Sequence, residues 1–193
     1  MKLFEVPVGA SRPSCATNID IVLPTHGPRL KHLQGDDNSC TVCSLASALY
    51  AFGDTYASNY VHKRLAEVSE LPNLNRMVYL CDLMSGHHRM KGEKRLKYKA
   101  TLWKNGQFDI IEHYTDVPVL CRIQDTFGAT DHCITVWRKW MFDSNYTHAF
   151  PRTLKWLNFV CARRTEGDET CTAQYRSVYE AVQVNNLNNK FIP

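Results

Sequence analysis

The segment from Cys40 to Phe52 constrains the fold of this chain more than any other, because it is small and apolar almost throughout. The polar residues Asp36-Asp37-Asn38-Ser39 stand directly before it as capping residues, and Gly53 stands where a helix C-terminus is expected. A helix that is apolar on nearly all sides must be covered on nearly all sides. The sequence therefore predicts a central, buried helix around which the rest of the domain packs.

The remainder of the chain divides into an arm and one domain. Residues 1–35 are rich in proline and glycine and predict an extended N-terminal arm, whereas residues 36–193 suit a single domain. The first half of that domain has helical periodicity and the second half has strand-like runs, which predicts an α+β fold with an antiparallel sheet. We expect further helices at 57–69, 74–84, 151–163 and 171–183, and strands at 96–103, 107–114, 118–123, 132–137 and 140–145. An Asn-Gly turn at 104–106 is expected to join the first two strands in a hairpin.

The composition excludes several classes of protein. The formal net charge of +4 is mild, and the one basic cluster, residues 91–99, has no nucleic-acid motif beside it, so we expect no nucleic-acid partner. No segment has the character of a signal peptide or of a membrane-spanning helix. The eight cysteines are irregularly spaced, so we expect reduced thiols in an intracellular, cytoplasmic protein, with no metal and no cofactor.

Cys40 has the position of an activated nucleophile. Only the thiolate attacks, and the N-terminus of a helix lowers the pKa of a thiol. The same end of the helix offers unpaired backbone N–H groups that can stabilise an oxyanion. Cys43 lies almost a full turn further along, where the dipole effect fades, and stands as the alternative nucleophile. A buried helix also holds cysteines simply as small apolar side chains.

A second group of polar residues lies in a predicted hairpin. A two-residue turn at Arg138-Lys139 would place His132 directly opposite Asn145, with Asp143 on the same face, one diagonal step away. An amide or a carboxylate beside an imidazole holds one tautomer and stabilises the charged ring. Strand pairing favours Asn145 in this role and charge favours Asp143, so both stay open. Alone, each residue is typical of an ordinary hairpin or turn.

The order of these residues resembles that of papain-like cysteine peptidases. In that family the nucleophile begins a helix, as Cys40 does, and the base and its orienting residue lie on adjacent strands, as is expected of His132 and its partner. Gln34 lies six residues before Cys40, which is the spacing of the family's oxyanion-hole glutamine. An alignment on Cys43 would put Asp37 at that position instead. The strand expected at 118–123 is also similar to this family and to bacteriocin-leader peptidases.

The resemblance covers residues 34–53 and 117–145, under a third of the chain. It implies a papain-like core, in which N-terminal helices pack on a C-terminal antiparallel sheet. The activity it implies is that of a cysteine hydrolase, a peptidase or isopeptidase, which acts on proteins or peptides through a thioester. Two other functions stay open: an inactive papain-like binding or scaffold protein, and a thiol–disulfide oxidoreductase that uses Cys40-Thr41-Val42-Cys43. The sequence indicates no oligomeric state.

Overall fold

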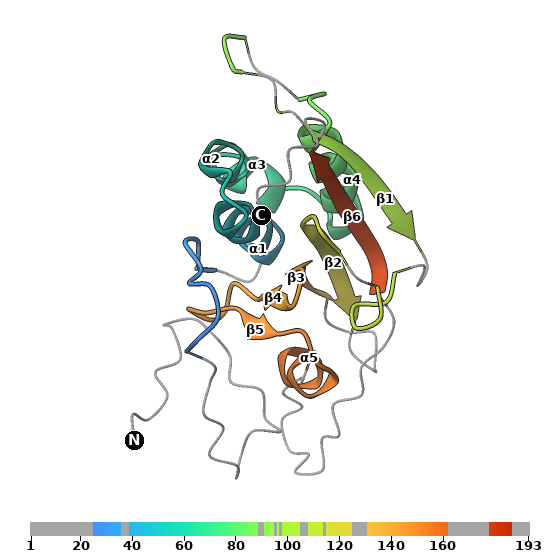
Figure 1. Ribbon diagram of the computed structural model, residues 1–193. Coiled ribbons are helices and arrows are strands. Elements are labelled where there is room, and N and C mark those ends of the chain that lie inside the picture. Colours follow the sequence, from blue (N-terminus) through green and yellow to red (C-terminus); the bar gives the residue numbers. More distant parts are fainter. Residues whose placement is uncertain are drawn as a thin grey trace.

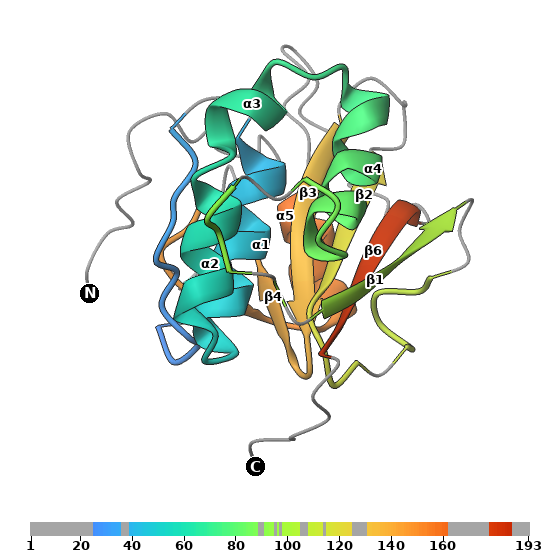
Figure 2. The same ribbon diagram turned by 90° about the horizontal axis from the view of Figure 1, so that it is seen from above.

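The computed structural model describes residues 25–35, 39–88, 91–94, 96, 98–104, 108–113, 115–124, 131–161 and 178–186. Within these ranges the chain forms helices and strands that pack in layers (Figures 1 and 2). The helices are α1 (Cys40–Ala51), α2 (Thr55–His62), α3 (Leu65–Ser69), α4 (Asn73–Met84) and α5 (Leu154–Cys161). The strands are β1 (Tyr98–Lys104), β2 (Val119–Gln124), β3 (Asp131–Trp137), β4 (Trp140–Phe142), β5 (Phe150–Pro151) and β6 (Val178–Asn186).

The strands form one antiparallel sheet in the order β1-β6-β2-β3-β4-β5. The last strand of the described chain, β6, therefore lies inside the sheet, between β1 and β2. Figure 1 shows α1 to α4 on one side of this sheet and α5 on the other, and the core residues divide in the same way. The predicted α+β class, with N-terminal helices packed on an antiparallel sheet, is confirmed.

Alternate residues of the central strands divide the core into two layers. On β2, Leu120 packs with the α1 and α4 side, whereas Cys121 packs with the α5 side. On β3, Cys133 belongs to the α1 side and Ile134 to the α5 side. This is the two-residue period of a strand that is buried on both faces.

Helix α1 is buried at the centre of the helical layer, as predicted. Every residue from Cys40 to Leu49 is buried. Ser39 is the N-cap residue, but its side chain makes no capping hydrogen bond, and residues 36–38 lie outside the described ranges. Gly53 follows the helix with φ of 97°, a left-handed conformation that glycine adopts without a steric penalty. The predicted C-terminal end of the helix is therefore confirmed.

The helix predicted at 171–183 is wrong. Residues 178–186 form strand β6, and residues 171–177 lie outside the described ranges. Val182 and Val184 face the α1 and α4 layer while Ala181 faces the α5 layer, so both faces of the strand are buried. Because β6 also pairs with a strand on each side, its conformation is fixed by partners that are distant in the sequence.

The strand predicted at 107–114 is also wrong over its described residues, 108–113, and residues 105–107 and 114, which include the expected Asn-Gly turn, lie outside the described ranges. Residues 108–113 form a turn, in which the Asp109 carboxylate accepts hydrogen bonds from the backbone N–H groups of Ile111 (2.7 Å) and Glu112 (2.9 Å). A carboxylate that bonds the backbone two and three residues ahead favours a turn over a strand. Strand β1 pairs with β6 instead.

Two further predictions need smaller corrections. The helix expected at 57–69 is two helices, α2 and α3, which are separated where the buried Arg64 turns inward and donates a hydrogen bond to Glu93 at 2.8 Å. Strand β4 ends at Phe142, whereas a strand was expected as far as residue 145. The helices expected at 74–84 and 151–163 correspond to α4 and α5.

The described part of the arm, residues 25–35, runs along the loop that follows β4. The Leu30 backbone N–H donates to the Thr147 carbonyl oxygen, and the Gln34 N–H donates to the Ser144 carbonyl oxygen, each at 2.9 Å. These bonds tie the arm to the loop at two points, so they fix the position of Gln34. No helix in the described ranges is both long enough and apolar enough to cross a membrane.

Candidate active site

The fold brings the start of α1 close to the start of β3. Helix α1 packs along β3, and the Thr135 hydroxyl of β3 donates to the Ser44 hydroxyl of α1 at 3.3 Å. Both partners of this bond are buried, so it is protected from competition with water. The packing places Cys40, the first residue of α1, beside His132, the second residue of β3.

The sulfur of Cys40 contacts two neighbouring residues of β3. The Cys40 residue is 5% exposed, and the Cys133 thiol, the Cys133 backbone N–H and the His132 ring lie close enough to its sulfur to act on its pKa. The hydrogen bond from Cys133 and the hydrogen bond and positive charge of His132 hold the pKa of Cys40 well below its usual range, although burial opposes them. These neighbours therefore favour the thiolate form of Cys40.

His132 lies between Cys40 and a buried carboxylate. Its Nε2–H donates to Asp143 Oδ1 at 3.0 Å, which leaves Nδ1 as the ring nitrogen for the Cys40 sulfur. The His132 side chain is 21% exposed and that of Asp143 only 1%. Burial lowers the pKa of His132, but the Asp143 carboxylate and the Cys40 thiolate together raise it well above its usual range. Within this group of three side chains, Asp143 and Cys40 both favour the charged form of the His132 ring.

Asp143 rather than Asn145 contacts the histidine. The β3–β4 ladder has the predicted register, with Trp137 opposite Trp140, but it stops at Phe142, so Asn145 is not paired with His132. Asn145 instead donates its backbone N–H to Asp143 Oδ1 at 3.0 Å. The same carboxylate oxygen thus accepts from both residues, and Asn145 contributes to the site by fixing this carboxylate.

Gln34 lies beside this group because the arm holds it there. The Ser144 hydroxyl donates to Gln34 Oε1 at 3.3 Å, and Ser144 directly follows Asp143. Since its carboxamide oxygen accepts this bond, the Gln34 side chain keeps its NH₂ group as a donor. A half-buried donor tied to the residue after Asp143 suits the oxyanion-binding role that the resemblance implies for Gln34.

Cys43, the alternative nucleophile, lies further inside the helix. It is 1% exposed, and its backbone N–H is bonded to the Ser39 carbonyl oxygen at 2.9 Å. Of the two cysteines, Cys40 is the one that contacts His132. Among the described residues the contacts therefore favour Cys40.

Two residues at the site were not expected from the sequence, Cys133 and Ser144. The reasoning from strand pairing considers side chains on the face of His132, and Cys133 points to the other face. The signal that predicts its contact is the buried helix itself, because the residues of β3 that face this helix must meet its first turn. Ser144 could be found only by knowing where the arm runs.

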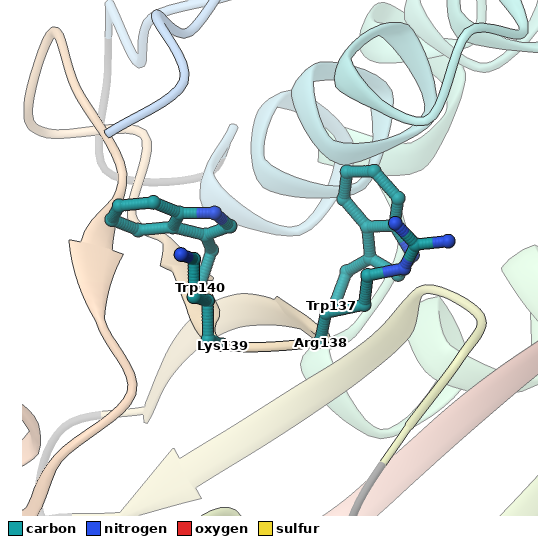
Figure 3. A pocket seen from close by; sticks show the side chains of 4 residues that line it. All are labelled: Trp137, Arg138, Lys139 and Trp140. Atoms are coloured by element: carbon teal, nitrogen blue, oxygen red, sulfur yellow. The ribbon is translucent and has the colours of Figure 1, made fainter. Parts of the chain in front are cut away.

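A separate hollow lies at the other end of the hairpin, and Figure 3 shows its walls. It has a volume of about 330 Å³ and is lined by Trp137, Arg138, Lys139 and Trp140. Arg138 and Lys139 form the turn between β3 and β4, and Arg138 has φ of 52°, which is typical of short hairpin turns. Trp137 lies five positions after His132 along the strand, a distance of about 17 Å. The hollow is therefore not part of the Cys40 site.

Comparisons with known proteins add no relative: no family model, no curated protein and no solved structure matches this chain. Among the described residues, no three histidine, cysteine or acidic side chains are grouped so that they could hold a metal ion. The function must therefore be argued from the chemistry of the site.

Proposed function

We propose that this protein is a cysteine-dependent hydrolase with a papain-like core, a peptidase or isopeptidase that acts through a thioester. One observation carries the proposal: Cys40 begins a buried helix and contacts His132, whose other ring nitrogen is bonded to Asp143 at 3.0 Å. A nucleophile, a base and a group that orients the base are the parts that nucleophilic catalysis by a thiol requires.

The first half of the reaction forms the thioester. The Cys40 thiolate attacks a carbonyl carbon, and the carbonyl oxygen becomes an oxyanion. The Cys40 backbone N–H, at the start of α1, and the Gln34 carboxamide donate hydrogen bonds to it. As the tetrahedral intermediate collapses, the His132 imidazolium gives its proton to the leaving amine and becomes neutral.

The second half releases the product and restores the enzyme. Neutral His132 takes a proton from a water molecule, the resulting hydroxide attacks the thioester, and the Cys40 thiolate leaves. His132 keeps the proton, so the ion pair is formed again. Asp143 serves in both halves, because a buried carboxylate stabilises the charged form of the ring and holds Nδ1 toward the sulfur.

The substrate class follows from the resemblance to papain-like peptidases, and we propose a protein or a peptide. The inactive alternative, a binding or scaffold protein of the same fold, requires an inert thiol at residue 40. The oxidoreductase alternative requires Cys40 and Cys43 to exchange a disulfide. Among the described residues the Cys40 sulfur contacts His132, Cys133 and Thr41, which favours the hydrolase.

The rate of alkylation by iodoacetamide, measured for each cysteine against pH by peptide mass spectrometry, tests the proposal. We expect Cys40 to react below neutral pH, where Cys121, whose pKa is raised by burial, does not. The variant His132→Ala should abolish this difference. Rapid labelling of Cys43 in place of Cys40 would identify Cys43 as the nucleophile. Equal, slow labelling of all cysteines in folded protein would favour the inactive alternative.

A further inference from the structure

The nucleophile of the proposed hydrolase has a second thiol beside it. Cys133 follows His132 on β3 and faces the α1 layer, where it packs in the same core cluster as Cys40. Both residues are 5% exposed, and their thiols lie close enough for each to act on the pKa of the other. The proposed hydrolysis uses the Cys40 sulfur and the His132 ring, whereas the Cys133 thiol favours the Cys40 thiolate but takes no part in the bonds that form and break.

We infer that Cys40 and Cys133 form a site of reversible oxidative modification, in which a hydroperoxide oxidises Cys40 and Cys133 then closes a disulfide with it. This inference rests on the proposed thiolate of Cys40. The disulfide removes the nucleophile and stops hydrolysis, and a dithiol reductant restores both thiols. The pair therefore makes the enzyme sensitive to peroxide while protecting Cys40 from irreversible oxidation.

The first step needs only the groups already at the site. The Cys40 thiolate attacks one oxygen of the hydroperoxide, the O–O bond breaks, and Cys40 becomes a sulfenic acid. The leaving hydroxide or alkoxide takes the proton of the His132 imidazolium, which becomes neutral. Peroxide is small, and it would approach the sulfur beside the His132 side chain, which is 21% exposed.

In the second step Cys133 resolves the sulfenic acid. Neutral His132 accepts the Cys133 proton, the Cys133 sulfur attacks the Cys40 sulfur, and the S–O bond breaks. The hydroxyl group leaves as water with that proton. With hydrogen peroxide, two thiols give one disulfide and two waters, so electrons and atoms balance.

The local charges favour this second step once Cys40 is oxidised. In the reduced protein, the hydrogen bond to Cys40, burial and the negative charge of Cys40 raise the pKa of Cys133 well above its usual range. Oxidation to the sulfenic acid removes that charge. Arg122, which lies opposite Cys133 in the β2–β3 ladder, and the Thr41 side chain then act in the other direction and lower the pKa of Cys133.

Among the described cysteines the geometry favours Cys133 as the partner of Cys40. Cys121 lies on the neighbouring strand but faces the α5 layer, on the other side of the sheet from Cys40. Cys81 lies on α4. Cys133 is the cysteine that the described structure places in contact with Cys40.

The test uses the full chain, reduced and then treated with stoichiometric hydrogen peroxide. Remaining thiols are blocked with iodoacetamide, and peptides are identified by mass spectrometry. We expect a peptide pair linked through Cys40 and Cys133, loss of labelling at Cys40, and full recovery of labelling after dithiothreitol. In Cys133→Ala, peroxide should carry Cys40 to sulfinic acid, which dithiothreitol does not reverse. Cys121→Ala, the matched control, should behave as the wild type does.

The outcomes separate this inference from the proposed function. If Cys40 of the reduced wild type is not labelled faster than Cys121, the proposed function and this inference both fail. If Cys40 is labelled rapidly but peroxide yields no Cys40–Cys133 peptide, or links Cys40 to another cysteine, only this inference is overturned. The wild-type measurement decides it even if Cys133→Ala does not fold.

Discussion

Replacing Asp143 with asparagine is the change that bears most directly on the proposed ion pair. Asparagine keeps the size and one acceptor oxygen of aspartate but removes its charge. The bond that changes is the 3.0 Å contact between His132 Nε2 and Asp143 Oδ1, in which the carboxylate side chain is 1% exposed. A hydrogen bond to a charged group contributes about 1.5–3 kcal/mol, and about 1.4 kcal/mol corresponds to a tenfold change in an equilibrium constant.

We therefore expect Asp143→Asn to reduce the equilibrium constant for the Cys40–His132 ion pair by about tenfold to about a hundredfold. The rate of Cys40 alkylation below neutral pH should fall by the same factor, because in this range the ion pair sets the fraction of thiolate. The measurement is the rate of iodoacetamide labelling of Cys40 against pH. At alkaline pH, where the thiol ionises without help, the variant and the wild type should converge.

Asn145→Ala is the matched control for this prediction. Asn145 bonds Asp143 through its backbone N–H, which alanine retains, so we expect little change in the labelling of Cys40. If Asn145→Ala slows labelling as much as Asp143→Asn does, or if Asp143→Asn leaves it unchanged, the assignment of Asp143 as the orienting residue is wrong.

Three further predictions concern the arm, a histidine and the core. Gly27→Ala should lower the melting temperature, because the added Cβ would clash with the Ala149 carbonyl oxygen. Gly35→Ala, where the added Cβ meets nothing within 4 Å, should leave it unchanged, and equal melting temperatures of the two variants would refute this contact. Burial and nearby positive charge hold the pKa of His32 at about 4, against 6.5 in an unfolded chain, so stability that is present above pH 6.5 should fall as the pH drops toward 4. The variant His32→Gln should flatten part of that slope in urea unfolding, and an unchanged slope would contradict the assignment. Leu45→Ala, at a fully buried position of α1, should cost about 2–5 kcal/mol in urea unfolding, and a cost below about 1 kcal/mol would contradict a tightly packed helix.

The elements that were predicted correctly are those that local chemistry fixes. Helix α1 could be predicted from its own segment, because the segment is continuously apolar and is followed by Gly53. The turn at Arg138-Lys139 fixes the β3–β4 register over the pairs nearest to it, from Trp137–Trp140 to Thr135–Phe142. The α+β class was likewise predicted from local patterns, the helical periodicity of the first half of the domain and the strand-like runs of the second half.

The elements that were missed depend on partners far away in the sequence. Residues 178–186 form a strand because β1 and β2 pair with them on both sides, and no local pattern records these partners. The same β6 takes the place that the strand expected at 107–114 would have had beside β1. Local sequence patterns give little information on which strands pair when the partners are far apart in the chain.

Some features of the candidate site could be anticipated from the sequence, and others could not. From the sequence, Cys40 and His132 were assigned to one candidate site. The sequence could not choose between Asp143 and Asn145, because that choice depends on where the β3–β4 ladder ends. The chain leaves the strand at Phe142, so Asp143 rather than Asn145 meets the ring. The contact of Cys133 with Cys40 depends on how α1 packs across β3, which strand pairing does not reveal.

The charge state of His132 at neutral pH tests the central claim most directly, and it needs no substrate. Nitrogen NMR of the labelled imidazole ring distinguishes a ring protonated at both nitrogens from a neutral tautomer, and His132→Gln identifies the signal. The proposed ion pair predicts that both nitrogens carry protons at neutral pH, and that ring deprotonation shifts to lower pH after Cys40 is alkylated. A neutral His132 ring at neutral pH in the folded, reduced protein would contradict the account.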